Sequence, residues 1–326
     1  MRRRDFIALL GSGAAAWPLP ARSQQPAIPT IGFLNYASRA SAEIYVAPFR
    51  QGLKETGFVE GQNISIEYRW ADGQYGRLPE LAADLVGARV AAMLCGGSVS
   101  AVPCKAATTT IPIVFTSGED PVTVGLVESL NRPGGNVTGV YSLTNGLEEK
   151  RLGLLRQLVP QASVIGAIAN PRRLDAEIQT RDLQEAARAL RQEIHIFNAS
   201  SAPEIDTAFA AISQLRAGAL IVGSDPSYIA RRDQFVALAA RYSVPTIYFQ
   251  REFAESGGLI SYGTNLGEGY RQAGIYVGQI LKGIKPGDLP VLQSTKFELI
   301  INLKTAKTLG LTVSSGLLSI ADEVIE

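Results

Sequence analysis

The chain has 326 residues, of which 46% are hydrophobic and 19% are charged, with 31 basic and 30 acidic side chains. A formal charge of +1 predicts no attraction to nucleic acid or to an anionic membrane. The two cysteines, Cys95 and Cys104, exclude a disulfide scaffold and a multi-cysteine metal site, and the length suits a soluble protein of one or two domains.

Residues 1–23 have the pattern of an export signal peptide rather than of a folded segment. A basic start is followed by a short apolar run, and Ala21-Arg22-Ser23 has the small-residue pattern of a cleavage site. The run is too short to span a bilayer. Arg3-Arg4-Asp5-Phe6-Ile7 resembles the twin-arginine export signal. Because no cysteine lies near the cleavage site, we expect a mature chain that begins near Gln24 and is free in the periplasm, without a lipid anchor.

From Pro29 onward, apolar runs typical of strands alternate with helical patterns. The predicted strands of the first half are 31–34, 64–70 and 90–94, and the predicted helices are 42–56, 77–87 and 99–107. This alternation favours a parallel sheet with right-handed crossovers.

Residues 111–141 form the most informative unit of the first half. Ile113-Val114-Phe115 reads as a buried strand, and the small and acidic residues 116–120 follow it at once. Asp120-Pro121 predicts the start of a helix with an apolar stripe of Leu126, Val127 and Leu130, which ends at Arg132-Pro133-Gly134-Gly135. A further strand begins at Asn136. Since ligands bind outside the carboxyl ends of strands in open α/β sheets, residues 116–120 are the first place to look for function.

The alternation begins again after Tyr141. The second half has predicted helices at 147–159, 173–191 and 227–241, and strands at 164–169, 194–197, 220–222, 244–249 and 259–262. Ser201 and Glu204 have the spacing of a capping box. Two such sets predict an α/β fold with two doubly wound parallel-sheet lobes joined by crossover strands.

Several long motifs resemble the substrate-binding proteins of ABC transporters. They are IPIVFTSGEDPVTVGLVESLNRPGGNVTGV, FRQGLKETGFVEGQNISIEYRWADGQYGRLPELAADLV and GGLISYGTNLGEGYRQAGIYVGQILKG, with INLKTAKTLGLTV and ADEVIE near the end. The resemblance covers residues 31–326 and points to the group that includes tryptophan- and tyrosine-binding members. Where such proteins usually carry Thr-Pro-Ala-Ala, this chain has Ser98-Val99-Ser100-Ala101, which keeps a hydroxyl but lacks the proline.

The resemblance implies the type I periplasmic-binding fold, whose chain crosses between the lobes three times. Residues 24–141 and 263–289 would then form the first lobe, and residues 142–262 and 290–326 the second. The helix 269–281 would pack on the first lobe, and a last strand, 297–301, would lie near the second.

If the lobes face each other, the ends of their strands line a cleft. The candidate ligand-binding residues lie at or near these ends: Asn35, Tyr36, Ser98, Ser117, Glu119, Asp120, Tyr141, Asn170, Asp225 and Tyr248. The acids, asparagines and serines among them also have a simpler, structural interpretation. Asp120 and Asp225 suit helix N-caps, and the asparagines and serines suit turns. Glu119 also suits a solvated turn.

Other polar residues have a structural reading. His195 alternates with isoleucines inside a predicted strand, and Arg172-Arg173 reads as a solvated helix face. For Cys95 and Cys104, the sequence leaves both a disulfide and two free thiols open.

Catalytic signatures are missing from the sequence. It has no Walker loop, no dinucleotide fingerprint after the first strand, no G-x-S-x-G elbow and no metal-ligand spacing, so we expect neither an enzyme nor a cofactor. The favoured function is that of a periplasmic solute-binding protein that delivers a small molecule to an ABC permease by hinge closure. The alternatives are a ligand-sensing module for a membrane receptor and an exported α/β enzyme.

The candidate residues also suggest the ligand. Hydroxyls and helix N-termini favour a carboxylate, acids favour an ammonium, and aromatic walls favour an apolar body. We therefore expect a small zwitterion, with an aromatic or branched amino acid first and an aromatic carboxylate second. A monomer without a nucleic-acid partner is expected.

Overall fold

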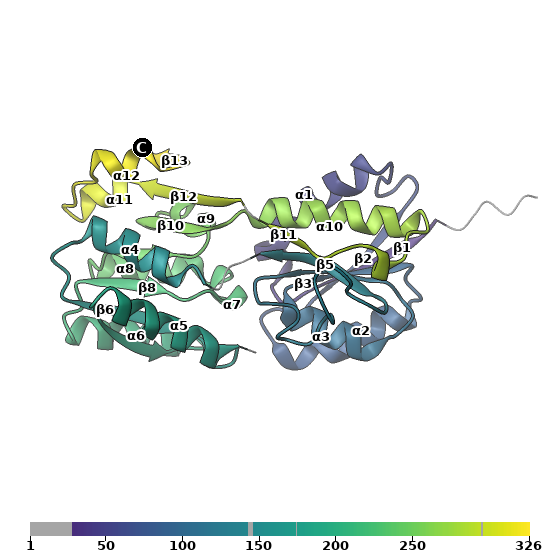
Figure 1. The fold of residues 1–326 in the computed structure, drawn as a ribbon, viewed down its shortest axis with the longest axis horizontal. Coiled ribbons are helices and arrows are strands. Elements are labelled where there is room, and N and C mark those ends of the chain that lie inside the picture. Colours follow the sequence, from purple (N-terminus) through teal and green to yellow (C-terminus); the bar gives the residue numbers. More distant parts are fainter. Residues whose placement is uncertain (1–27, 143–145, 174, 295) are drawn as a thin grey trace, which may run out of the picture.

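The computed structural model describes residues 28–326 except 143–145, 174 and 295 (Figure 1). Two lobes lie side by side along the long axis, each built from one sheet with helices on both of its faces. The predicted signal peptide, residues 1–23, lies outside the described residues. No helix in the described ranges combines the length and the apolar character needed to cross a membrane.

The first lobe contains a six-stranded sheet in the order β11-β5-β4-β3-β1-β2, with every pairing parallel. Its strands are β1 (Thr30–Asn35), β2 (Ser65–Trp70), β3 (Ala92–Gly96), β4 (Ile113–Ser117), β5 (Val137–Ser142) and β11 (Leu292–Ser294). Its helices are α1 (Arg39–Glu55), η1 (Tyr75–Arg77), α2 (Leu78–Gly87), α3 (Ser98–Ala107), α10 (Leu266–Leu281) and η2 (Pro286–Asp288).

Helices α1 and α10 cover one face of this sheet, and α2 and α3 cover the other. The central strand β4 is therefore buried on both faces, and Ile113, Val114 and Phe115 are inaccessible to solvent. This burial explains the continuous apolar run in the sequence.

The second lobe contains a seven-stranded sheet in the order β13-β12-β10-β9-β8-β6-β7, in which only the β10–β12 pair is antiparallel. Its strands are β6 (Val164–Ala169), β7 (Glu193–Asn198), β8 (Ala219–Val222), β9 (Thr246–Tyr248), β10 (Ile260–Thr264), β12 (Phe297–Asn302) and β13 (Glu323–Ile325). Its helices are α4 (Glu148–Leu158), α5 (Ala176–Ala189), α6 (Ala202–Gln214), α7 (Pro226–Ile229), α8 (Arg232–Arg241), α9 (Arg251–Glu255), α11 (Leu303–Thr308) and α12 (Ser315–Ser319).

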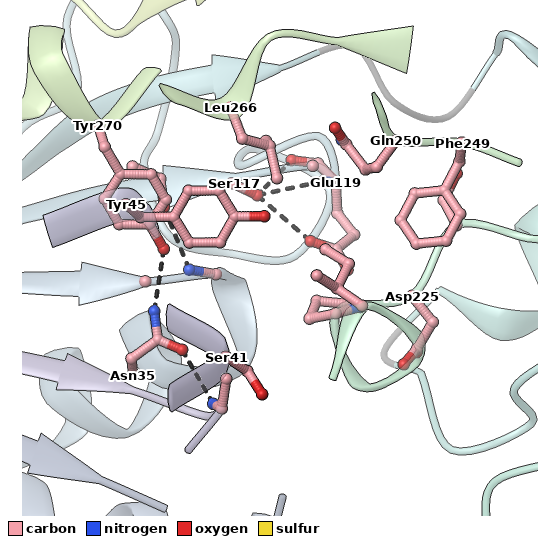
Figure 2. Close-up of a pocket in the computed structure, with 18 of the residues that line it drawn as sticks. Asn35, Ser41, Tyr45, Ser117, Glu119, Asp225, Phe249, Gln250, Leu266 and Tyr270 are labelled. Carbon is pink, nitrogen blue, oxygen red and sulfur yellow. Dashed lines mark hydrogen bonds between the residues drawn. The ribbon is translucent and has the colours of Figure 1, made fainter. Parts of the chain in front are cut away.

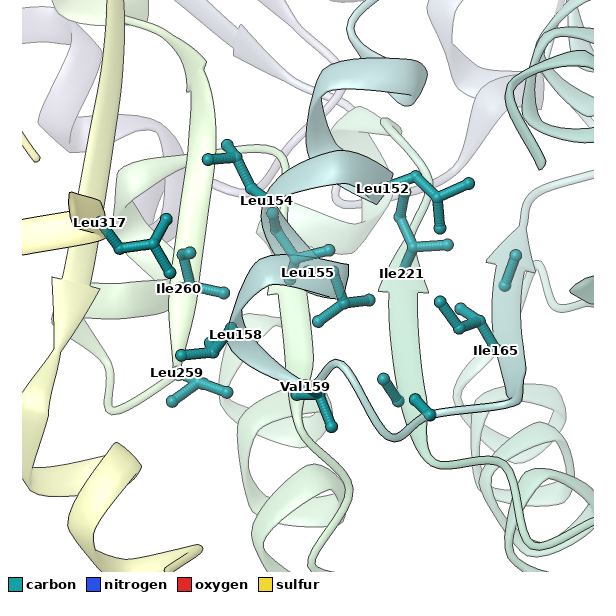
Figure 3. Close-up of a cluster of buried hydrophobic side chains, with 14 of the residues drawn as sticks. Leu152, Leu154, Leu155, Leu158, Val159, Ile165, Ile221, Leu259, Ile260 and Leu317 are labelled. Atoms are coloured by element: carbon teal, nitrogen blue, oxygen red, sulfur yellow. The ribbon is translucent and has the colours of Figure 1, made fainter. Parts of the chain in front are cut away.

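The largest buried cluster of this lobe lies between α4 and the sheet (Figure 3). Leu152, Leu155 and Leu158 follow helical spacing and point from α4 toward Ile221 and Ile260 of the strands. Packing on this face fixes α4 on the sheet. The predicted capping box of α6, formed by Ser201 and Glu204, is present.

The chain passes between the lobes three times, after β5, after β10 and after β11. The predicted helix 269–281 is part of α10, which packs against α1 of the first lobe, and the predicted last strand is β12 of the second. The third crossing comes later than the predicted boundary at residue 290. Leu292–Ser294 forms β11, which pairs with β5 in the first sheet, and not with the second lobe.

One predicted helix is wrong. Residues 121–130 form turns, in which Leu126 donates its N–H to the carbonyl of Pro121. Gly125 has a φ of +73°, which interrupts helical geometry at that point. Leu126 and Val127 are nevertheless buried in the first lobe, so the apolar pattern was read correctly and its backbone was not.

Candidate functional site

A cleft lies between the two lobes, and the loops at the carboxyl ends of their strands line it (Figure 2). The first lobe contributes residues after β1, β3 and β4 and from α1 and α10, and the second contributes residues after β6, β8 and β9. The lining residues are Asn35, Ala37, Ser41, Tyr45, Gly96, Gly97, Thr116, Ser117, Gly118, Glu119, Arg173, Ser224, Asp225, Pro226, Ile229, Phe249, Gln250, Leu266 and Tyr270. Four of the ten predicted residues are among them: Asn35, Ser117, Glu119 and Asp225.

Asn35 and two tyrosines form one wall of the cleft. Asn35 Nδ2 donates to Tyr270 Oη at 2.9 Å, and its Oδ1 accepts from the N–H of Ala37 at 2.9 Å. The Tyr270 ring stacks on that of Tyr45, with centroids 4.8 Å apart and an angle of 8°. A Cβ on Gly96 would lie 2.2 Å from Asn35 Nδ2, so glycine is needed there for this amide to reach Tyr270. Burial raises the pKa of Tyr45 and Tyr270, so both hydroxyls stay neutral.

Glu119 brings a buried carboxylate to the cleft from the loop after β4. It is 2% exposed, and Ser98 Oγ donates to its Oε2 at 2.5 Å. Ser117 Oγ lies 3.4 Å from the same oxygen and donates to the Glu119 carbonyl at 2.7 Å. Ser98 therefore does not line the cleft itself but orients Glu119, which does.

Asp225 supplies the facing carboxylate from the second lobe. It is 1% exposed, its Oδ1 accepts from the N–H of Ser227 at 2.7 Å, and its Oδ2 accepts from Asn170 Nδ2 at 3.1 Å. Asn170 thus supports Asp225 from behind the lining. Burial raises the pKa of Asp225, although the Arg173 guanidinium opposes that shift.

Arg173 is the residue that sequence reasoning missed. The structure buries it in the segment between β6 and α5, whereas the sequence predicted a solvated helix face. Its guanidinium contacts both carboxylate oxygens of Asp175, at 2.8 and 3.1 Å, and Nη2 lies 3.0 Å from Glu119 Oε1. Nη1 donates to the carbonyl of Ser224. The available signal was its position four residues after the end of a buried strand.

The predicted aromatic residues do not line this cleft. Tyr36 stacks on Tyr75 with centroids 4.3 Å apart and donates to the carbonyl of Gly73 at 2.6 Å. Tyr141 lies in the first-lobe core, where burial raises its pKa to about 12. Tyr248 lies in the second-lobe core, stacked on Phe253 at 4.7 Å. Successive side chains of a strand point to opposite faces of the sheet, and Tyr248 points to the face that α6 and α8 cover.

Asp120 takes the simpler of its two readings. It is exposed, and its Oδ1 accepts from the N–H groups of Val122 at 2.8 Å and Thr123 at 3.3 Å. It therefore caps a turn beside the cleft instead of lining it.

The remaining reactive side chains lie outside the cleft lining. Cys95 and Cys104 are buried free thiols in the first lobe. His195 lies in β7 with its Nε2 2.8 Å from Glu193 Oε1, in an exposed pair. Within the described ranges, no group of three or more histidine, cysteine or acidic residues could hold a metal ion.

Comparisons with known proteins show which family model and relatives the chain matches. Residues 31–325 match the family model described as ABC transporter substrate binding protein. A tyrosine-binding protein of Clostridioides difficile strain R20291 is 28% identical over 281 residues, which cover 86% of this chain and 81% of that protein.

Solved structures show the same fold. A conserved domain protein from Vibrio cholerae is 26% identical, with a TM-score of 0.84 over 91% of this chain and 99% of that one. An ABC domain from Streptococcus pneumonia in complex with L-Trp gives 24% and 0.84 over the same shares. A ligand-free, open substrate-binding protein with adhesive properties from Clostridium difficile also gives 24% over these shares, but a TM-score of 0.67.

Proposed function

The chain belongs to the ABC transporter substrate binding protein family, and from this premise we propose that it binds a small zwitterionic amino acid between its lobes. An aromatic amino acid is the first candidate. The lobes close on it, and the closed protein delivers it to an ABC permease in the inner membrane.

The charge of the cleft is the observation that carries this proposal. Two buried carboxylates, Glu119 and Asp225, line the cleft from opposite lobes, and Arg173 is the one basic side chain among its described lining residues. A third acid, Asp175, pairs with that arginine from behind. The cleft thus has an excess of negative charge, which favours a ligand that carries an ammonium group.

The apolar lining favours an aromatic body for the ligand. Tyr45 and Tyr270 present a stacked pair on the first-lobe side, and Phe249 lies on the opposite side (Figure 2). Ile229 and Leu266 add aliphatic surface. Aromatic rings gain from such neighbours beyond the burial of their area. The cleft also holds Gly97, directly before α3, and a helix N-terminus favours a carboxylate.

The relatives support the same ligand class. One is described as tyrosine-binding, and another was solved with L-Trp. At equal identity and coverage, the present arrangement is more similar to the L-Trp complex than to the ligand-free, open structure. This difference supports hinge closure as the mode of binding.

Calorimetric titration of wild type and Asp225→Asn with a panel of amino acids and aromatic acids tests the ligand class. We expect wild type to bind an aromatic amino acid, and the variant to lose about 2–5 kcal/mol of binding free energy, because the ligand ammonium would lose its buried partner. Asparagine keeps the oxygen that accepts from Ser227, so the cap survives.

Asp120→Asn is the matched control, since Asp120 caps a turn in an exposed position outside the lining. It should bind the ligand as wild type does. If no amino acid or aromatic acid in the panel binds, or if Asp225→Asn binds as wild type does, the assigned ligand class is wrong.

We also propose that the mature protein acts in the periplasm as a monomer. The signal-like residues 1–23 support export, and the twin-arginine pattern at Arg3-Arg4 supports the route. Membership of the family supports the permease as partner.

A further inference from the structure

Glu119 and Arg173 face each other across the cleft and form an ion pair between the lobes. Glu119 follows β4 of the first lobe, and Arg173 follows β6 of the second. Arg173 Nη2 lies 3.0 Å from Glu119 Oε1, and the two side chains are 4% and 3% exposed. A charge-assisted hydrogen bond in such a protected position is stronger than one on the surface.

Each partner of this pair is also held within its own lobe. Asp175 binds the Arg173 guanidinium through both carboxylate oxygens, and the carbonyl of Ser224 accepts from Nη1. Glu119 keeps the hydrogen bond from Ser98 Oγ to its carboxylate, while Ser117 Oγ donates to its backbone carbonyl. Opening the lobes therefore breaks the bond between Glu119 and Arg173 but leaves each side chain with a hydrogen-bond partner in its own lobe. A buried charge that lost all its partners would make opening far more costly.

A second bond joins the lobes close to the cleft. Tyr45 Oη of α1 donates to Glu252 Oε1 of α9 at 3.2 Å. Like the ion pair, this bond is made between side chains of the chain itself, so neither depends on a bound molecule.

We infer that Arg173 is a positioning residue whose bond to Glu119 acts as a latch and holds the two lobes closed. This Glu119–Arg173 latch gives the free protein a substantial closed population. The inference rests on the proposed function in that the closed cleft is the state that binds ligand.

The latch affects ligand affinity through this population. When only a fraction of the molecules has the binding-competent arrangement, the apparent dissociation constant equals the intrinsic one divided by that fraction. The latch raises this fraction before ligand binds and so lowers the apparent dissociation constant. A substitution of Glu119 would also remove a carboxylate that attracts the ligand ammonium, so affinity alone cannot separate the two roles of this carboxylate.

The test therefore measures the distance between the two lobes in protein without ligand. Spin labels at Arg39→Cys and Asp233→Cys report the distance between α1 and α8, one helix in each lobe. Both native side chains are highly exposed, at 80% and 81%, and their ion pairs are at the surface. Cys95 and Cys104 are buried and are not labelled. Double electron–electron resonance then gives the closed and open populations.

Glu119→Gln removes the charge while keeping the shape. We expect the ratio of closed to open protein to fall roughly ten-fold or more, as for the loss of one hydrogen bond between charged groups. The matched control is Glu60→Gln, which removes a carboxylate from an ion pair with Arg50 inside the first lobe. This control should keep the wild-type distribution.

Arg173→Gln provides a second route to the same result, and the double variant should show little further change, because both substitutions remove one bond. A distance distribution that Glu119→Gln leaves unchanged would overturn the latch, as would an equal change in Glu60→Gln or a fully open wild type. None of these outcomes depends on which ligand binds, so failure of the latch and failure of the proposed ligand are separate results.

Discussion

At the scale of single residues, Asp225 combines two roles that the sequence presents as alternatives. Its Oδ1 accepts from the first turn of α7, as an N-cap does, and the residue also lines the cleft. The two roles are compatible because a capping carboxylate at the end of β8 already faces the opposite lobe. Burial makes the charge costly, and its raised pKa records that cost.

The raised pKa of Asp225 predicts a pH dependence of stability. Because the folded state holds this proton more tightly than the unfolded state, Asp225 favours folding most at low pH, and this contribution is lost as pH rises through the raised pKa. Because asparagine does not titrate, the stability of Asp225→Asn relative to wild type should be highest near pH 7 and should fall as pH falls toward the ordinary aspartate value of 3.8. Urea unfolding of both proteins without ligand, across this range, measures the difference.

Glu204→Gln controls for the sign of this effect. Hydrogen bonds from Ser200 lower the pKa of Glu204, so its contribution is present at neutral pH and is lost as pH falls through the lowered pKa. Wild type should be more stable than Glu204→Gln at pH 7, and this difference in stability should shrink as pH falls. The stability of Glu204→Gln relative to wild type therefore changes with pH in the opposite direction to that of Asp225→Asn. Equal trends in the two variants would contradict the assignment of the shifts.

The sequence predicted four lining residues at or just after strand ends: Asn35 and Ser117 end β1 and β4, and Glu119 and Asp225 follow β4 and β8 within three residues. Asn170 also follows a strand but supports Asp225 from behind the lining, a difference that local sequence does not reveal. The prediction for Tyr248 was wrong because this residue is the last of β9 and points into the core, whereas the next residue, Phe249, lines the cleft. The prediction for Arg173 was wrong because Glu119 and Ser224, which hold its guanidinium, are distant in the sequence and reach it only in the folded chain.

At the scale of elements, the first lobe depends on a close contact between two helices that are distant in sequence. Helices α1 and α10 lie side by side over the sheet. Gly52 of α1 and Gly274 of α10 lie at the contact, where a Cβ would lie 1.9 Å from the Arg271 carbonyl oxygen or 2.3 Å from that of Phe49. Small residues thus let the two backbones approach.

Gly52→Ala should destabilise the first lobe despite the better helix propensity of alanine. Propensity favours alanine by about 1 kcal/mol, but overpacking against a backbone carbonyl costs about 1–3 kcal/mol. Because the Cβ would meet backbone, which cannot swing away, we expect a net loss. Trp70, the one tryptophan outside the predicted signal peptide, lies in β2 of the same lobe, and its fluorescence during urea unfolding measures the change.

Gly87→Ala is the control for this substitution. Gly87 is the last residue of α2 in the same lobe, and a Cβ there meets nothing within 4 Å. It should leave stability unchanged or raise it slightly. If Gly52→Ala behaved like this control, the helix contact would be looser than the structure shows.

Most elements were predictable because their apolar residues follow the periods of strands and helices. The helix expected over residues 121–130 was an exception, since an apolar stripe at 126–127 fits a buried turn as well as a helix. Strand β11 was not predictable from pattern, because it has three residues and is mostly exposed. It pairs with a strand about 150 residues earlier, a contact that local sequence does not reveal.

At the scale of the whole molecule, each lobe is assembled from distant parts of the chain. The first lobe needs α10 and β11 from the C-terminal third, and the second needs β12 and β13 from the end. The three crossings therefore connect two sheets that each remain incomplete until late in the chain. The cleft lies between these sheets, so its two walls move with the lobes as they open and close.

We propose that the first residues of the chain determine the route by which the whole protein is exported. Replacing both Arg3 and Arg4 with lysine keeps the positive charge and removes the guanidinium groups, which lysine does not replace in geometry. A general secretory signal needs only a basic start, so this change separates the routes. We expect the double variant to accumulate as uncleaved precursor in the cytoplasm, measured by fractionation and immunoblotting. Arg2→Lys, the same change one residue earlier, should be exported normally. Normal periplasmic accumulation of the double variant would instead point to the general secretory route.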